Sequence, residues 1–223
     1  MTKIKLAAFK LIHLALIAAL AGAAVAAAAS ATGQDMYKGY ELPPYEVIEG
    51  QGDIELRRYA PHILAEVEVQ GSQSKAISRG FQMLANYIFG GNEAGQKIAM
   101  TVPVGQVPQA PQAPEARMAE SWTVSFMMPA RFNRDTLPRA KSSAITFVTT
   151  EAETLLVVGF KGFRNERALA SKTDTLLAEA ERRGLTQTGA PRYFFYDGPM
   201  TPPWARRNEV AIPVTGIKTA QSS

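Results

Sequence analysis

Residues 97–104 read Lys97-Ile98-Ala99-Met100-Thr101-Val102-Pro103-Val104, and this is the most informative stretch of the sequence. It follows a segment with helical spacing of apolar residues that ends at Phe89-Gly90-Gly91. A short apolar run bounded by turn residues is typical of a buried strand. We therefore predict a loop that leads into a strand over residues 98–104. Pro103 interrupts this strand, because proline has no backbone N–H to donate.

The segments before this stretch predict three strands and a helix. Residues 45–49 and 53–59 alternate between polar and apolar side chains on either side of Gly50-Gln51-Gly52, as in a hairpin. Residues 62–69 form a third candidate strand. From residue 74 to residue 89 the apolar side chains fall on one helical stripe, with Ser72 or Ser74 as the cap.

The segments after it repeat this order. The proline-bearing residues 106–119 predict a flexible surface loop. A second helix is expected over residues 166–183, with Asn165 as its cap and Gly184 as its stop. Strands are expected over residues 122–128, 144–148, 154–160, 193–196 and 209–214. Two similar halves of this kind predict an α+β fold, a distorted antiparallel β-barrel with two flanking helices.

The N-terminal segment has the pattern of a secretory signal. Lys3, Lys5 and Lys10 precede an apolar run over residues 11–20, and residues 21–29 are mostly alanine. We expect residues 1–30 to be a leader and the protein to be periplasmic or secreted. An uncleaved anchor, which holds the protein on the membrane facing the periplasm, is the alternative. Residues 31–44 are expected to form a linker, residues 45–216 the domain and residues 217–223 a disordered tail.

Charge and cysteine content exclude several classes of protein. The formal net charge is +4, and three lysines with no acid lie before residue 30, so cleavage leaves +1 (4 − 3). No dense basic patch with interleaved aromatic residues is present, which argues against a nucleic-acid partner. Without cysteine the chain has no disulfide framework.

Candidates for chemistry are few. His13 lies in the expected leader, which leaves His62 as the single histidine of the mature chain. No Gly-x-Ser-x-Gly motif or histidine-rich metal pattern occurs, so we predict that the protein is not an enzyme. His62 is either an exposed residue at the start of a strand or an axial ligand of haem iron. Both interpretations remain open at this stage.

A charged run, Arg206-Arg207-Asn208-Glu209, directly precedes the last predicted strand. Such a run is either a solvated turn or a paired ionic cluster that fixes the end of the chain. We favour the cluster over a role in substrate binding.

Several segments taken together resemble the SOUL haem-binding protein family. The resemblance rests on Tyr45-Glu46-Val47, Glu55-Leu56-Arg57-Arg58-Tyr59, Tyr87-Ile88-Phe89-Gly90-Gly91-Asn92, residues 97–104, Phe126-Met127-Met128-Pro129 and Arg206-Arg207-Asn208-Glu209-Val210. It implies the barrel with two helices and pseudo-symmetric halves, a fold similar to that of GyrI-like effector-binding domains. It also implies non-covalent binding of haem or a free porphyrin in a shallow apolar groove.

The resemblance places that groove on the outward face of the first helix. In this chain the corresponding cofactor-binding positions are Ser78, Phe81, Gln82, Ala85 and Asn86, together with Thr201 in the loop before the last strand. The expected function is that of a haem carrier, buffer or scavenger. Two alternatives are a binding module for other amphipathic small molecules and an enzyme that uses Glu93 or Glu209 on a tetrapyrrole.

Overall fold

The computed structural model describes residues 35–109 and 119–216, which belong to one compact unit. The expected leader over residues 1–30, the tail over residues 217–223 and most of the loop over residues 106–119 lie outside the described residues. Among the described residues, no helix has the length and apolar character needed to cross a bilayer.

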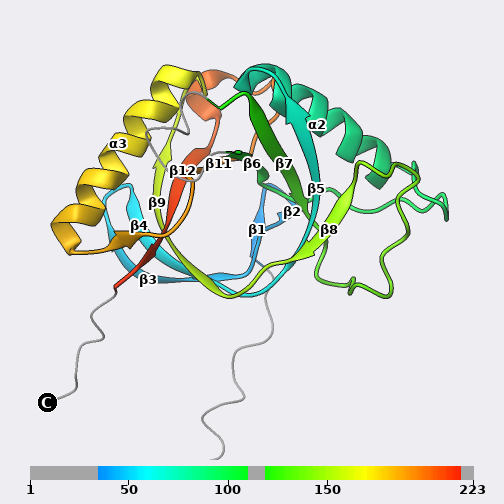
Figure 1. Ribbon diagram of the computed structural model, residues 1–223, viewed down its shortest axis with the longest axis horizontal. Helices are drawn as coiled ribbons and strands as arrows, with labels where there is room; N and C mark the ends of the chain where they lie inside the picture. Colours follow the sequence, from blue (N-terminus) through cyan, green and yellow to red (C-terminus); the bar gives the residue numbers. More distant parts are fainter. Residues whose placement is uncertain (1–34, 110–118, 217–223) are drawn as a thin grey trace, which may run out of the picture. The chain divides into compact units, whose positions relative to one another are not determined.

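One antiparallel sheet of ten strands curls into a half-barrel, and two helices lie on its outer side (Figure 1). The strand order is β3-β4-β9-β12-β11-β6-β7-β5-β8, and the short β10 also pairs with β12. The strands are β3 (Tyr45–Gln51), β4 (Ile54–Tyr59), β5 (Ile63–Gln70), β6 (Val104–Pro108), β7 (Ser121–Met127), β8 (Thr146–Thr149), β9 (Glu153–Phe160), β10 (Thr186–Gln187), β11 (Arg192–Phe195) and β12 (Asn208–Thr215).

The order of elements along the chain contains two copies of one pattern, which confirms the predicted pair of halves. Strand, strand, helix, strand, strand describes both β4-β5-α2-β6-β7 and, apart from the short β10 and η2, β8-β9-α3-β11-β12. The inner strands β6 and β11 meet at the centre of the sheet. The first strand of each half pairs with the other half, because β4 pairs with β9 and β8 pairs with β5.

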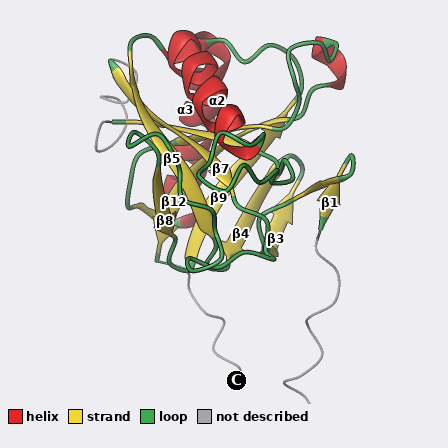
Figure 2. Ribbon diagram, turned by 90° about the vertical axis from the view of Figure 1, so that its right-hand side faces the viewer, coloured by secondary structure: helices red, strands yellow, loops and turns green. Residues whose placement is uncertain are grey.

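The two helices begin and end close to the predicted residues. Helix α3 (Glu166–Arg183) begins where the Asn165 side chain accepts a hydrogen bond from the Ala168 backbone, and it ends at Gly184 in the left-handed conformation. Helix α2 (Gln73–Ile88) begins at Ser72, whose side chain makes no capping bond. In Figure 1 α3 lies at the left and α2 at the right of the central strands, and Figure 2 shows both helices at the same end of the molecule.

Alternation along each strand separates two faces of the sheet. On β7, the side chains of Trp122, Val124 and Phe126 belong to the core under the helices. Thr123, Ser125 and Met127 alternate with these residues and line the inner side of the curl. A period of two along a strand produces this division. Alternate residues of the same strands therefore pack under the helices or line the inner side of the half-barrel.

Residues 97–104 differ from their predicted conformation. The strand begins at Val104, where it was expected to end, and residues 98–103 approach it as an irregular segment. Thr101 makes an isolated bridge to Glu41, and its hydroxyl donates to the Met127 carbonyl at 2.6 Å. Because Pro103 cannot donate to a ladder, regular pairing starts only after it. The Val102–Pro103 peptide bond is cis.

Two segments expected to be irregular instead belong to the fold. Residues 106–108 continue β6, and Gln106 is buried with its amide donating to the Gln73 carbonyl. Part of the expected linker forms a small hairpin, β1 (Met36–Tyr37) and β2 (Tyr40–Glu41). Leu42 follows the hairpin and packs in a buried cluster with Val102, which gives this segment a tertiary partner.

Candidate ligand-binding cavity

A cavity of about 430 Å³ lies on the inner side of the curled sheet. Its size falls in the range of about 300–1,000 Å³ that small-molecule pockets occupy. The apolar part of its wall consists of Pro43, Leu64, Pro103, Val107, Met127, Val148, Leu155 and Phe194. These residues come from both halves of the molecule, so the curl of the whole sheet creates the cavity.

His62 lines this cavity directly before β5. Its Nδ1 lies 2.9 Å from the Ala60 carbonyl oxygen and 3.2 Å from the Thr150 hydroxyl. Since a carbonyl can only accept, Nδ1 carries the proton and Nε2 keeps its lone pair. Nε2 has no hydrogen-bond partner within the described part of the chain. Burial lowers the pKa of His62, which favours the neutral ring.

A polar cluster forms one part of the cavity wall beside His62. Arg192 on β11 donates from Nη2 to Glu153 at 2.6 Å and also pairs with the other oxygen of that carboxylate. Glu66 also lines the cavity, and burial raises its pKa, although Arg192 opposes the shift. Arg192 and Glu153 remain partly exposed. A ligand in the cavity therefore meets apolar walls, one neutral histidine, one paired arginine and the carboxyl groups of Glu66, Glu151 and Glu153.

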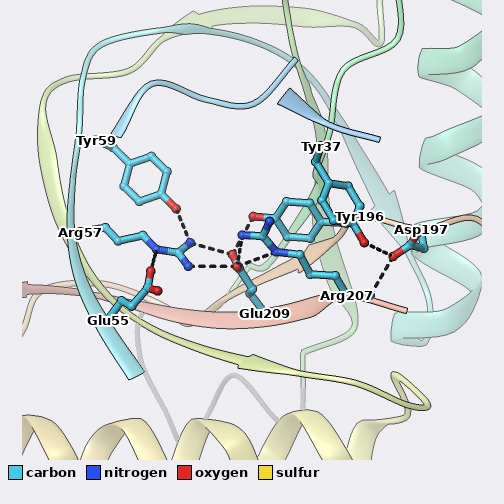
Figure 3. A network of polar contacts seen from close by, with 8 residues as sticks. All are labelled: Tyr37, Glu55, Arg57, Tyr59, Tyr196, Asp197, Arg207 and Glu209. Atoms are coloured by element: carbon cyan, nitrogen blue, oxygen red, sulfur yellow. Dashed lines mark hydrogen bonds and ion pairs between the residues drawn. The ribbon is translucent and has the colours of Figure 1, made fainter. Parts of the chain in front are cut away.

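Glu209 lies beside the cavity in a buried ionic network (Figure 3). Arg57 donates to both carboxylate oxygens of Glu209 at 2.9 and 3.1 Å, and Arg207 donates at 2.7 Å. The Tyr196 hydroxyl donates to the same carboxylate at 2.7 Å. Burial by itself would raise the pKa of Glu209, but the two guanidinium groups outweigh burial and lower it.

This network reaches the cavity through Tyr59, whose hydroxyl lies 3.3 Å from Arg57 and whose ring lines the cavity. On its other side Asp197 accepts a hydrogen bond from Tyr37 of the β1–β2 hairpin (Figure 3). Lys38 of the same hairpin also donates to Asp197. The prediction of an ionic cluster is confirmed for Arg207 and Glu209. Arg206 instead donates to the carbonyls of Thr201 and Pro199.

The other predicted site residues lie outside the cavity. Ser78, Phe81, Gln82 and Asn86 are exposed on α2, and Ala85 is buried beside them. Phe81 packs edge-on against Phe126 with ring centroids 5.4 Å apart. Thr201 is half-buried in the loop after β11. Of the seven predicted residues, His62 alone is among those that line the cavity.

Sequence reasoning missed Arg192, Phe194 and most of the cavity wall. The available signal was alternation, because every second residue of β5, β6, β7 and β11 faces inward. Alternation does not indicate which face of a curled sheet is left open. Among the described residues, no group of three or more histidine, aspartate or glutamate side chains is arranged to hold a metal ion.

Known proteins similar to this chain share its sequence pattern and its fold. The family model of the SOUL heme-binding protein matches residues 40–213. Heme-binding protein 2 of Homo sapiens is 33% identical over 144 residues, which cover 64% of this chain and 66% of the human protein. Heme-binding protein 2 of Mus musculus is 28% identical over 144 residues, 62% of this chain and 68% of the mouse protein.

Solved structures with similar folds are more distant in sequence. The C-terminal domain of EcmrR superposes with a TM-score of 0.59 at 15% identity, covering 78% of this chain and 99% of that domain. An uncharacterized conserved protein from Listeria innocua superposes with a TM-score of 0.54 at 14% identity, covering 73% of this chain and 92% of that protein. At such identities the likeness concerns the fold alone.

Proposed function

The chain belongs to the SOUL heme-binding protein family, and from that premise we propose that it binds haem or a related tetrapyrrole reversibly in the inner cavity. The observation that carries this proposal is His62, whose Nδ1 is engaged by Ala60 and whose Nε2 is available to a ligand in the cavity. A neutral imidazole oriented through its other nitrogen is a common ligand of haem iron.

The apolar residues of the cavity fit the faces of such a ligand. A tetrapyrrole is a broad apolar disc, and burial of apolar surface contributes roughly 25 cal/mol per Å². Leu64, Val107, Leu155 and Phe194 supply apolar surface for it. Arg192 would pair with a propionate at the partly exposed side of the cavity. The propionate would either replace Glu153 as the partner of Arg192 or share the guanidinium group with it. Bound haem would supply an iron centre and a strong absorption band; this chain would supply the wall, the imidazole and the arginine.

Binding rather than turnover is the role that the surrounding groups support. Glu209, one of the two acids considered for catalysis, is held by Arg57, Arg207 and Tyr196 and has no capacity left for a substrate proton. Glu93, the other, is exposed. We therefore propose a carrier, buffer or scavenger of tetrapyrroles. A binding module for other amphipathic molecules is the alternative, because the same cavity would take other apolar ligands.

Haemin titration of the purified protein tests the proposal. We expect the Soret band to shift and to saturate near one equivalent. In His62→Ala we expect the histidine-type spectrum to disappear and to return on addition of imidazole, which would enter the space that the side chain leaves. Phe81→Ser on the outer face of α2 is the matched control and should titrate like the wild type.

Two results would count against this site. A saturable spectrum that survives in His62→Ala and is lost in Phe81→Ser would move the ligand to the outer face of α2. The absence of any saturable shift, with stabilisation by other amphipathic molecules in a thermal-shift screen, would favour the alternative ligand class.

We also propose that the protein is exported. The support is the basic, apolar and alanine-rich order of residues 1–30 in the sequence. Intact-mass measurement on protein from the periplasmic fraction should give a chain that begins near residue 30. Recovery of the full-length chain from the membrane fraction would instead identify residues 1–30 as an anchor.

A further inference from the structure

Exposed apolar side chains gather on two loops at one edge of the molecule. The three most exposed large apolar side chains among the described residues are Met200 at 94%, Trp204 at 74% and Phe163 at 65%. Phe163 lies in the loop between β9 and α3. Met200 and Trp204 lie in the loop between β11 and β12, which includes the short η2 (Pro203–Ala205) and is orange-red at the top of Figure 1. Large exposed apolar groups that cluster call for an explanation.

The two loops are fixed to one another. The Gly162 backbone N–H donates to the Pro203 carbonyl at 2.9 Å, and the Asn208 side chain donates to the Gly162 carbonyl at 3.2 Å. Residues 162 and 203 are therefore neighbours although they lie far apart in the sequence. Phe163 and Trp204 each directly follow one of these residues, so the two exposed side chains come from adjacent positions on the joined loops.

Internal bonds hold the second loop in shape. Arg206 donates from Nε to the Thr201 carbonyl and from Nη2 to the Pro199 carbonyl, each at 2.7 Å. Prolines at 199, 202 and 203 restrict its backbone further. Met200 and Trp204 are thus presented by an ordered loop, and little conformational entropy remains to be lost when they contact a partner.

The charge on these loops is basic. Residues 161–167 and 198–206 together carry four basic side chains, Lys161, Arg164, Arg167 and Arg206, against one acidic side chain, Glu166. Arg164 lies over the Phe195 ring with 4.7 Å between its Cζ and the ring centroid, and it is close enough to Arg206 for the two charges to repel. Neither arginine pairs with a carboxylate within the described residues.

We propose that these two loops dock the protein on an anionic phospholipid surface. Tryptophan and phenylalanine side chains that project from ordered loops suit the interface between headgroups and acyl chains. The surrounding lysine and arginine side chains attract anionic headgroups. An acidic protein would match the charge, but a bilayer supplies acyl chains for the projecting apolar side chains and anionic headgroups for the basic ones at the same surface. The proposal does not depend on what the inner cavity binds.

Vesicle binding by the full-length protein tests this docking surface. The probe is a vesicle of phosphatidylcholine and phosphatidylglycerol, with pure phosphatidylcholine as reference. The chain has two tryptophans, and Trp122 is buried, so quenching by brominated lipid reports on Trp204. We expect the anionic vesicles to quench Trp204 emission and to bind the protein in a salt-sensitive manner.

Matched variants separate this surface from the rest of the chain, including residues 1–30. Trp204→Ser should weaken partitioning about tenfold, and Lys161→Gln with Arg167→Gln should weaken it roughly 30-fold. The controls are Phe89→Ser, since Phe89 is 63% exposed elsewhere, and Lys141→Gln at another exposed site. Both should bind as the wild type does. Equal binding by Trp204→Ser, or equal quenching by neutral vesicles, would overturn the proposal, as would capture by polyglutamate without vesicle binding.

Discussion

At the scale of single residues, Glu209 shows how a buried charge is tolerated. Its side chain is 2% exposed, and three donors satisfy its oxygens. Removal of one member of such a group leaves the opposite charges buried without a partner, which typically costs about 3–5 kcal/mol. The exposed pair Arg58–Glu46, in contrast, belongs to a class worth about 0–1 kcal/mol.

Replacement of this carboxylate should therefore have a large effect. We expect Glu209→Gln to lower the free energy of unfolding by about 3–5 kcal/mol at pH 7, because Arg57 and Arg207 lose their counter-charge. Urea denaturation followed by circular dichroism measures the change. Arg58→Gln serves as the control and should change the free energy by less than about 1 kcal/mol. Similar losses in the two variants would contradict the importance of the network.

The same residue predicts a dependence on pH. The pKa of Glu209 is lowered in the folded protein, so its stabilising contribution is present above the unfolded value near 4.5 and is lost as pH falls through the lower folded value. We expect the stability difference between the wild type and Glu209→Gln to shrink as the pH falls below about 4. Denaturation curves between pH 7 and pH 3 provide the test, and a constant difference would contradict it.

At the scale of elements, the contact between α2 and the sheet depends on a glycine. A Cβ placed on Gly80 would lie 2.5 Å from Val124 Cβ, so the helix approaches β7 more closely than any larger residue allows. The gain of about 1 kcal/mol in helix propensity from glycine to alanine is therefore offset by overpacking, which typically costs about 1–3 kcal/mol.

Gly80→Ala should for this reason lower the thermal midpoint, although alanine is the better helix former. The matched control is Ser78→Ala on the exposed side of the same helix, where no close neighbour opposes the gain in propensity. Differential scanning calorimetry of both variants decides the matter. A higher midpoint for Gly80→Ala would mean that β7 moves away at little cost.

Elements with local signals were predictable from the sequence. Helix α3 carries both its cap, Asn165, and its stop, Gly184, within the chain, and its bounds agree with the prediction. The predicted strands that formed lie within about two residues of their observed bounds. The segment over residues 98–103 was not predictable in this way, because its conformation depends on Glu41 and Met127, which lie far from it in the sequence.

The candidate site was predictable only in part. His62 stood out because it is the single histidine after residue 30, but nothing near it indicated Ala60 and Thr150 as the partners of its ring. Arg57 and Glu209 are 152 positions apart, so their pairing appears only when β4, β9 and β12 assemble. The family resemblance supplied the fold and placed a groove on the outer face of α2, which stays a prediction; the cavity lined by His62 lies on the opposite face of the sheet.

At the scale of the whole molecule, the two halves are joined by an exchange of strands. Since β4 pairs with β9 and β8 pairs with β5, each half lacks one edge strand of its own. The inner cavity also takes its wall from both halves, with Leu64 and Met127 from one and Leu155 and Phe194 from the other. Neither half should therefore be stable alone.

Expression of the chain in two pieces tests this dependence. We expect the fragments 1–130 and 131–223 to lack cooperative unfolding when they are separate and to regain it when they are mixed. The cut falls between β7 and β8, where no ladder is broken. A cooperative transition in one isolated fragment would show that its sheet is complete without the exchanged strand.

The strand exchange also bears on how such a molecule can arise. A chain that carried a single repeat could complete its sheet only in a pair of copies. The first strand of each copy would then pair with the sheet of the other copy. The present chain has the connectivity that results when two such partners are joined end to end by gene duplication. In a dimer of that kind the pairing of β6 with β11 would form the subunit interface.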